Sequence, residues 1–331
     1  MGIPVEFVSQ GCKLRGRFYC AVGEPPFPTI LLLGGFPGNE TDVLQLGQGL
    51  SQHGVNTLTF NYCGTHQSEG TYSLRHTLED IHAAWLYLHE EGIIHSFQIN
   101  TGRLLVGGYS YGGGMALVYA VGHTEIKRVL SIAGTDHGEL ARAYERSPAL
   151  AATIDGMFEE LKAPSGPVRF EGKGGIEELT RNPAPYDLRL SAPVLANRDI
   201  LLIGGWDDLN VTIEDHTLPF YRLLVACNAP KVQIVAFQDD HYSKRAVRNW
   251  SRSLPIGFWP REPVRRPCVA LTPWRSGRRH HPHPQGDLPP PDPDHRRGDR
   301  RAGLRVVWTE WWGRVGDSPP HTVRPAATER C

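Results

Sequence analysis

The chain has 331 residues, of which 40% are hydrophobic and 21% are charged, a composition typical of an ordinary soluble globular protein. Lys plus Arg equals Asp plus Glu at 35 each, so the formal net charge is zero and neither a nucleic acid nor a membrane surface is indicated as a partner. No run of about 18 apolar residues occurs, and we therefore expect no membrane-spanning helix.

The N-terminal residues and the cysteines bear on the compartment. The chain opens Met1-Gly2-Ile3-Pro4-Val5 without a basic and apolar leader, so no secretory signal peptide is expected. Its cysteines show neither a CxxC pair nor metal-ligand spacing, and they are Cys12, Cys20, Cys63, Cys227, Cys268 and Cys331. Free thiols in a reducing cytoplasm are the expectation, with no metal site and no organic cofactor.

Apolar runs alternate with amphipathic stretches over residues 1 to about 252. The expected strands are 4–9, 14–20, 29–33, 55–60, 103–107, 127–132, 199–204 and 231–237. The expected helices are 43–53, 74–91, 113–122, 139–146, 151–161, 214–227 and 243–251. Continuous apolar runs such as Ile30–Leu33 are typical of strands buried on both faces. The pattern predicts an α/β fold with a mostly parallel sheet between helices, and an antiparallel hairpin of the first two strands.

A glycine-flanked serine stands between a buried strand and a helix. The strand Leu104–Gly107 is followed by Gly108-Tyr109-Ser110-Tyr111-Gly112 and then by helical residues. Side chains two positions before and after the serine would clash in this tight turn, and glycine removes both Cβ atoms. Ser110 is therefore the predicted nucleophile, raised above the sheet at the positive end of the next helix. A glycine-rich turn with a helix-capping serine is the alternative.

Acyl transfer also needs backbone N–H groups that bind the developing oxyanion. Tyr111, directly after the nucleophile, supplies one donor by its position. The second donor is expected from the loop after strand 29–33, which reads Gly34-Gly35-Phe36-Pro37-Gly38. Because Pro37 has no N–H group, we assign the second donor to Phe36.

About 65 residues separate strand 127–132 from strand 199–204, whereas a crossover needs only about a dozen. We interpret the surplus, roughly 136–190, as a small helical cap over the nucleophile. Amphipathic pieces at Glu139–Glu145 and Ile154–Leu161 support this interpretation. Caps of this kind set the size of the substrate and exclude water.

A serine hydroxyl needs a base, and the base needs an acidic partner that fixes its tautomer. Strand 199–204 leads into Asp207 and Asp208, and both are candidates for the acid. Strand 231–237 leads into His241, which stands where the base is expected, on the loop after the last predicted strand. His216, in the helix after the acid loop, and His137, in the inserted segment, are weaker candidates for the base.

The composition changes abruptly after about residue 252. Aliphatic residues become rare, while Pro, Arg and His accumulate, as in Arg278–Pro284 and Pro289–Pro293. Such a segment cannot bury enough apolar surface to offset the entropy of ordering, so residues 253–331 are predicted to be a mostly disordered tail. We hypothesise that the tail comes from a shifted reading frame or a non-native fusion.

Residues 1 to about 252 resemble the α/β-hydrolase superfamily, near the branch that prolyl-oligopeptidase-like and dienelactone-hydrolase-like enzymes share with small bacterial esterases. The matching segments are Gly34–Gly38, Asn61–Gly64, Ser68–Gly70, Gly108–Gly113, Gly205–Asp208 and Asp240–His241. In this family the catalytic acid is commonly the last residue of a Gly-x-x-Asp motif, which favours Asp208 over Asp207. Two positions depart from the family pattern: Gly34 stands where His is usual, and Cys63 where Arg is frequent.

The resemblance implies a serine esterase with a triad of Ser110, Asp208 and His241. It acts without a cofactor on small-molecule esters of small to medium acyl chains. Tyr109, Trp206 and Tyr242 flank the triad and are expected to line the substrate pocket, with simple packing as the alternative. Two other hypotheses are an aminoacyl or acyl-peptide serine peptidase and a non-catalytic binding protein that kept the fold.

Overall fold

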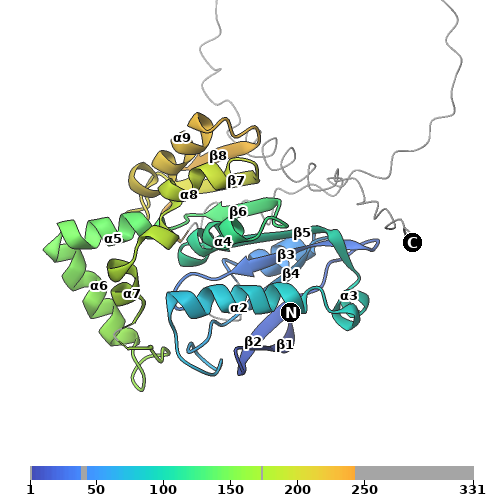
Figure 1. Ribbon diagram of the computed structural model, residues 1–331. Helices are drawn as coiled ribbons and strands as arrows, with labels where there is room; N and C mark the ends of the chain where they lie inside the picture. The colour runs from blue at the N-terminus through green and yellow to red at the C-terminus, as the bar shows by residue number, and fades with distance from the viewer. Residues whose placement is uncertain (1, 39–42, 173, 243–331) are drawn as a thin grey trace, which may run out of the picture.

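One sheet organises the molecule (Figure 1). The computed structural model describes residues 2–38, 43–172 and 174–242. Its strands are β1 (Ile3–Ser9), β2 (Cys12–Tyr19), β3 (Phe27–Leu33), β4 (Asn56–Phe60), β5 (Ile99–Tyr109), β6 (Arg128–Ile132), β7 (Asp199–Gly205) and β8 (Val232–Phe237). Their order across the sheet is β1-β2-β4-β3-β5-β6-β7-β8. Each overlaps one expected strand, and the largest difference is at β5, which begins at Ile99 rather than at 103.

The strand directions agree with the expected mostly parallel sheet. β1 and β2 form the expected antiparallel hairpin, in register from Ile3 opposite Phe18 to Ser9 opposite Cys12. β2 is also antiparallel to β4, and every later neighbouring pair, from β4–β3 to β7–β8, is parallel. The carboxyl ends of β3 to β8 therefore meet at one edge of the sheet, where ligands bind in such folds.

The helices follow the predicted pattern with several corrections. They are α1 (Leu46–Ser51), α2 (Leu74–Tyr87), α3 (Glu91–Phe97), α4 (Tyr111–Gly122), α5 (His137–Arg146), α6 (Pro148–Leu161), α7 (Gly175–Arg181), α8 (Leu188–Leu195) and α9 (Leu218–Ala226). A 3₁₀ turn, η1 (Ala184–Tyr186), precedes α8, and a π-helical turn, η2 (Ile213–Thr217), precedes α9.

The expected helix 74–91 is wrong in extent, because the backbone is extended at Glu90 and a new helix, α3, begins there. The sequence pattern also missed α7 and α8. The first is a single short helix of seven residues, and the second contains Pro193, which disrupts a helical reading. The expected helix 243–251 and the tail from 253 lie outside the described residues.

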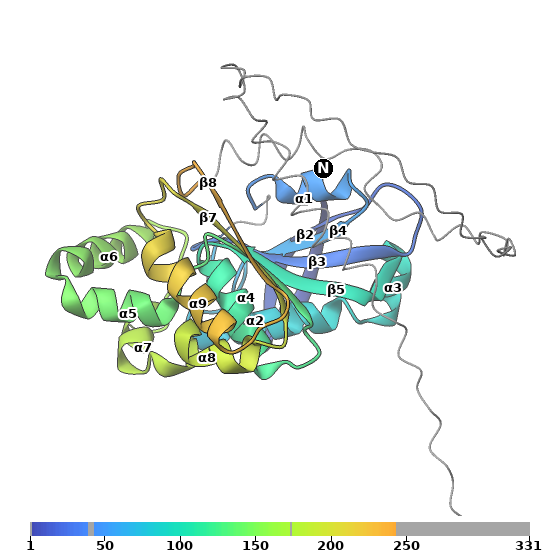
Figure 2. The same cartoon turned by 90° about the horizontal axis from the view of Figure 1, so that it is seen from above.

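The sheet separates two apolar layers, and β3 shows how one strand serves both. Ile30 and Leu32 pack with Leu46 and Leu50 of α1 on one face. Leu31 and Leu33 belong to the larger layer on the other face, because successive side chains of a strand point in opposite directions. Helices α2, α4, α8 and α9 cover this second face, and α1 covers the first (Figure 2).

The helix α4 is the most enclosed element of the larger layer. Every residue from Tyr111 to Ala120 is buried, as expected for a helix that is apolar all round. It packs against β3, β5 and β6 on the sheet side and against α2 and α8 on its flanks. The turn that carries Ser110 is thus fixed between the central strand β5 and the buried part of α4.

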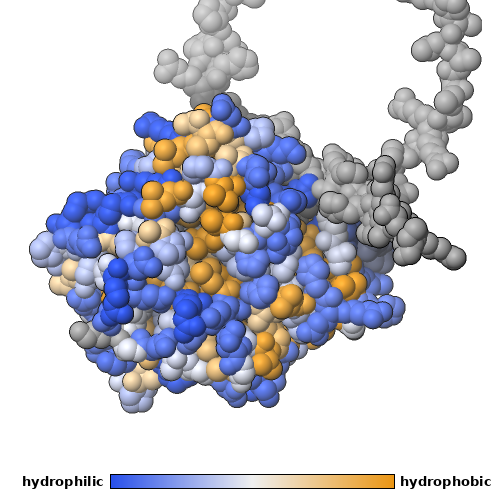
Figure 3. Space-filling model, viewed as in Figure 1, coloured by the Kyte–Doolittle hydropathy of each residue, from blue (hydrophilic) through white to orange (hydrophobic). Residues whose placement is uncertain are grey.

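The outer surface carries apolar side chains over α8 and α9 (Figure 3), where Leu190, Val194, Leu223 and Val225 are exposed. Both helices bury their opposite faces, α8 through Ala192 and Leu195 and α9 through Phe220 and Leu224. None of the helices in the described part of the chain is both long enough and apolar enough to cross a membrane.

Candidate active site

The backbone of Ser110 adopts an unusual conformation at the end of β5. Its φ is 54° and its ψ is −121°, in the positive-φ half of the map that residues with a side chain rarely occupy. Its N–H donates to the carbonyl of Ile132 in β6 at 2.8 Å, and its carbonyl accepts from Thr135 at 3.1 Å. The Ser110 side chain makes no capping hydrogen bond to α4, so the helix-capping alternative does not describe this turn.

Two glycines make the turn possible. A Cβ on Gly108 would lie 2.4 Å from the carbonyl carbon and oxygen of Gly112. A Cβ on Gly112 would lie 2.4 Å from the carbonyl oxygen of Gly34, in the loop after β3. Real Cβ atoms do not approach other atoms this closely, so both positions require glycine for the steric reason given by the sequence pattern.

A line of hydrogen bonds joins Ser110, His241 and Asp208 across the carboxyl edge of the sheet. His241 Nε2 lies 3.0 Å from Ser110 Oγ, and His241 Nδ1 lies 2.7 Å from Asp208 Oδ2. Asp208 is buried, and its Oδ1 accepts from the N–H groups of Asn210 and Val211, each at 2.8 Å. Because the carboxylate can only accept, Nδ1 carries the proton and Nε2 is left to accept the serine proton.

Of the two candidate acids, the structure brings Asp208 to His241. Asp207 is exposed, and its Oδ1 accepts from the amide of Gln238 at 2.6 Å. The other candidate bases lie in the polar region around the start of α5. His216 is buried and its Nδ1 accepts from the N–H of Asp136 at 3.2 Å. Burial lowers the pKa of His137 to about 3, with nearby His216 adding to the effect.

The three aromatic side chains expected to line a pocket differ in their environment. Tyr109 is partly buried, its hydroxyl donates to the carbonyl of His241 at 2.9 Å, and its ring centroid is 5.1 Å from the imidazole. Burial raises the pKa of Tyr109 well above its usual value, so the hydroxyl stays a donor. Trp206 and Tyr242 are 53% and 56% exposed, although the ring of Tyr242 is 5.9 Å from the imidazole.

A pocket of about 270 Å³ lies between Tyr109, the loop Gly34–Gly38, Val43 and Leu44. The loop lies against the nucleophile, because a Cβ on Gly35 would be 3.4 Å from Ser110 Cβ. This is the pocket that the described residues place directly beside the Ser110 turn.

Buried tyrosine hydroxyls fasten both expected oxyanion segments. Tyr62 donates its hydroxyl to the carbonyl of Gly34 at 2.6 Å, and Tyr111 donates its own to Thr77 Oγ1 at 2.7 Å. The ring of Phe36 lies 5.8 Å from that of Tyr111, so the two segments also pack together. Sequence reasoning missed the role of Tyr62, although this residue falls within a matched family segment.

Aromatic side chains of the inserted segment 136–190 lie over Phe36. Its ring centroid is 5.7 Å from that of Phe158 in α6 and 6.2 Å from that of Phe170. Tyr72 is nearer still, at 4.7 Å. Phe36 therefore joins the loop after β3 to the inserted segment.

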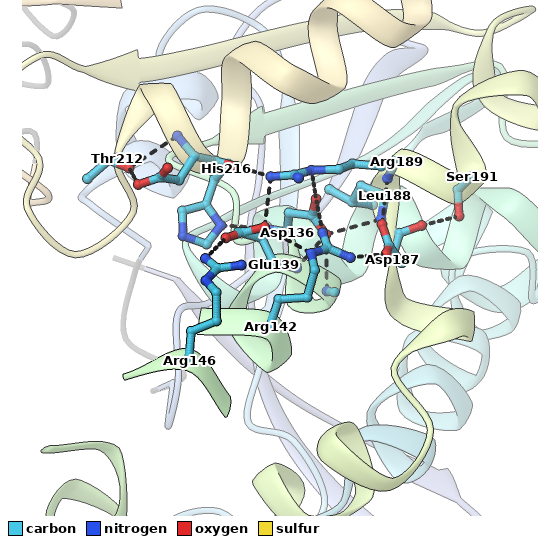
Figure 4. A network of polar contacts seen from close by, with 12 residues as sticks. Asp136, Glu139, Arg142, Arg146, Asp187, Leu188, Arg189, Ser191, Thr212 and His216 are labelled. Carbon is cyan, nitrogen blue, oxygen red and sulfur yellow. Dashed lines mark hydrogen bonds and ion pairs between the residues drawn. The ribbon is translucent and has the colours of Figure 1, made fainter. Parts of the chain in front are cut away.

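A polar network anchors the inserted helices (Figure 4). Asp136 begins it, accepting from Gly138 and Glu139 at the start of α5 and from Leu188 at the start of α8. Burial raises the pKa of Asp136 to about 6, although hydrogen bonds favour its charged form. The pattern Asp136-x-x-Glu139 is a helix-start signal that sequence reasoning could have used to place α5.

Three arginines complete this Asp136 network. Arg142 binds Glu139 at 3.0 Å and Asp187 at short range, and Arg189 binds Glu139 at 2.9 Å. Arg146 also binds Glu139, at 2.6 Å. Because Asp187 and Arg189 belong to the start of α8, these ion pairs tie α5 to α8. Within the described ranges, no cluster of three His, Cys, Asp or Glu side chains could hold a metal ion.

Comparison with known proteins gives a likeness in structure alone. No protein-family model matches the chain, and a search of curated proteins finds no match. Est1E from Butyrivibrio proteoclasticus, solved with ferulic acid bound, has a TM-score of 0.57 at 17% identity, over 75% of this chain and 95% of that one. The Pyrococcus furiosus esterase Pf2001 has a TM-score of 0.53 at 16% identity, over 76% of this chain and 89% of that one.

The likeness extends to a larger enzyme. Pyrococcus horikoshii acylaminoacyl peptidase has a TM-score of 0.53 at 18% identity, over 76% of this chain and 40% of that one. The chain thus spans less than half the length of that peptidase. At these identities the matches establish the fold: it is the α/β-hydrolase fold, as the family resemblance of the sequence implied.

Proposed function

We propose that this chain, which has the α/β-hydrolase fold, is a serine hydrolase that cleaves carboxylic esters through an acyl-enzyme. Ser110 is the nucleophile, His241 the base and Asp208 the acid that orients it. The observation that carries the proposal is the continuous line of hydrogen bonds from Asp208 through His241 to Ser110 Oγ. The strained backbone of Ser110 supports it, because such conformations cluster at functional sites.

The reaction follows from this arrangement. His241 Nε2 removes the proton of Ser110 as Oγ attacks the acyl carbonyl, and Asp208 stabilises the resulting imidazolium. Two backbone N–H groups donate to Asp208 Oδ1 and hold the carboxyl group in this orientation. The imidazolium then protonates the leaving alkoxide, and a water molecule, activated by the same imidazole, hydrolyses the acyl-enzyme.

The backbone N–H groups of Tyr111 and Phe36 are the proposed oxyanion donors. Removal of one such donor costs about 10²–10³-fold in rate, so their position matters. Two hydroxyl contacts support this assignment, since Tyr62 donates to the carbonyl of Gly34 in the loop before Phe36 and the side chain of Tyr111 is held by Thr77.

Esters of small to medium acyl chains are the proposed substrates. The support is the pocket of about 270 Å³ beside Ser110, between Tyr109 and the Gly34–Gly38 loop. Trp206 and Tyr242 are exposed aromatic side chains next in sequence to the acid loop and to His241, and they are proposed to contact the rest of the substrate. The alternative, hydrolysis of aminoacyl or acyl-peptide bonds, draws on the likeness to the acylaminoacyl peptidase.

The proposal is tested by active-site labelling and a substrate panel. A fluorophosphonate probe should label the chain on Ser110, and Ser110→Ala should abolish labelling. p-Nitrophenyl acetate, butyrate and decanoate, methyl ferulate and an aminoacyl-nitroanilide separate the substrate classes. Faster turnover of the nitroanilide than of every ester would favour the peptidase, and absence of labelling together with absence of turnover would favour a non-catalytic protein.

A further inference from the structure

Two cysteines that are far apart in the chain come together beside the β1–β2 hairpin. Cys12 is the first residue of β2, and Cys63 lies in the loop after β4. A Cβ on Gly70 would lie 2.3 Å from Cys63 Sγ and 2.8 Å from Cys12 Sγ, so the two sulfurs are separated by at most about 5 Å, the sum of these distances.

The strand pairing explains why the sulfurs meet. β2 and β4 are antiparallel, with Gly16 opposite Phe60, and the N–H of Asn61 continues the ladder by donating to Arg15 at 2.8 Å. The loop after β4 then turns back onto the start of β2, where the N–H of Glu69 donates to the carbonyl of Lys13 at 2.9 Å. Gly70 follows Glu69 and lies against both sulfurs, so this loop brings Cys63 to Cys12.

The two thiols differ in exposure and therefore in reactivity. Cys63 is buried and donates its S–H to the carbonyl of Glu69 at 3.2 Å, and burial raises its pKa to about 12. Cys12 is partly exposed, so a dissolved oxidant reaches its sulfur first. A buried thiol held beside an accessible one is the arrangement of a resolving and a reacting cysteine.

We propose that Cys12 and Cys63 form an oxidation site that closes to an intramolecular disulfide with oxidants of the peroxide class. The Cys12 thiolate attacks the peroxide and becomes a sulfenic acid, and the oxygen that leaves is released as water. The sulfur of Cys63 then displaces the hydroxyl of the sulfenic acid, and its proton completes a second water. Two thiols and one hydrogen peroxide thus give one disulfide and two waters.

Peptide mapping of the oxidised full-length chain tests this site. The protein is treated with hydrogen peroxide, free thiols are alkylated under denaturing conditions, and the digest is analysed by mass spectrometry with and without dithiothreitol. The expected product is a reducible link between the Cys12 and Cys63 peptides. Cys12→Ser, at a partly exposed position, should abolish the link, whereas Cys20→Ser, which removes an exposed free thiol, should leave it unchanged.

A stability measurement gives a second readout that does not depend on catalysis. Closing a loop of about 50 residues constrains the unfolded chain, so oxidation should raise Tm by about 5–10 °C in the wild type and in Cys20→Ser, but not in Cys12→Ser. Oxidation of Cys12 to a sulfinic acid while Cys63 remains alkylatable would overturn the proposal. A link from Cys12 to any other cysteine in place of Cys63 would overturn it as well.

Discussion

The sheet with its buried helix α4 and the inserted segment 136–190 are held together by different forces. Every residue of β3 and β7 is buried, and so are ten consecutive residues of α4. In α6, by contrast, Ile154 is the single buried residue of 14. The inserted segment is attached by a smaller set of buried side chains, among them Val168, Ile176 and Leu179, by the Asp136 network, and by the contacts of Phe158 and Phe170 with Phe36.

This difference separates two kinds of function. Ser110, Asp208 and His241 stand at the ends of β5, β7 and β8, so the dry core fixes their mutual geometry. The inserted helices contribute aromatic contacts with Phe36, and the ion pairs at their base are weaker constraints than close packing. Substitutions at the strand ends that carry the site should therefore alter the rate of the chemical step. Substitutions in the inserted segment should alter stability and substrate binding.

The largest effect should come from the acid at the end of β7. Asp208→Asn should lower kcat by about 10⁴-fold, because the imidazole loses its orienting anion and its correct tautomer. Asp207→Asn, its matched neighbour, removes only an exposed contact to Gln238 and should change kcat by less than about 3-fold. Steady-state kinetics with p-nitrophenyl butyrate provides the measurement, and the reverse ranking would show that the acid is Asp207.

The second prediction concerns the anchor of the inserted segment. Arg142→Met should lower the free energy of unfolding by about 3 kcal/mol, because it leaves buried Asp187 and Asp136 without their shared cation. Arg181→Met, which breaks an exposed i,i+4 pair with Glu177, should cost less than about 1 kcal/mol. Urea unfolding measures the free energy of unfolding of both variants. Equal losses would contradict the distinction between the Asp136 network and an exposed ion pair.

The third prediction uses pH to examine the same anchor. Burial raises the pKa of Asp136 from 3.8 to about 6, so the folded state favours the proton. This preference stabilises the folded state fully below about pH 4, and the stabilisation is lost as the pH rises through about 6. At about 1.4 kcal/mol per pKa unit, the free energy of unfolding falls by up to about 3 kcal/mol.

Asp136→Asn keeps an acceptor for the three N–H groups and cannot ionise. Its unfolding free energy should therefore fall less between pH 4 and pH 8 than that of the wild type. Urea unfolding at several pH values measures the difference, and parallel curves for the two proteins would count against this role of Asp136.

The smallest effect should come from the aromatic contact over the site. Phe158→Ala removes one ring that packs on Phe36, and aromatic pairs contribute about 0.5–1.5 kcal/mol. The expected result is a KM about 3–10-fold higher for p-nitrophenyl decanoate, with kcat changed by less than about 2-fold. Met157→Ala, at an exposed neighbouring position in α6, is the control. A fall in kcat at constant KM would place Phe158 among the groups that act on the reaction itself.

Sequence reasoning reached the sheet more completely than its surroundings. The eight strands were predictable because they are apolar runs bounded by turn residues, and the Ser110 turn because its glycines have a steric cause. The choice of Asp208 needed the family resemblance, since spacing alone left Asp207 equally eligible. Helix α8 escaped prediction because tertiary packing against α4 and α9 stabilises a segment that contains a proline.

The contacts that support the site could not be derived from local pattern. The hydroxyl of Tyr109 meets the carbonyl of His241 across 132 positions of sequence, and that of Tyr62 meets Gly34 across 28. Neither tyrosine differs in its local sequence from one that merely fills the core. The hydroxyls of Tyr109 and Tyr62 reach their acceptors only because the strand ends converge at the carboxyl edge of the sheet.

The backbone angle at Ser110 has an energetic consequence. A residue with a side chain at φ 54° makes the folded chain less stable than glycine would, at that one position, by about 1 kcal/mol or more. Where the hydroxyl is not needed, glycine would be the more stable residue at this position, because it adopts this backbone angle without strain. The proposed role of Ser110 as nucleophile accounts for a serine in place of glycine at this angle.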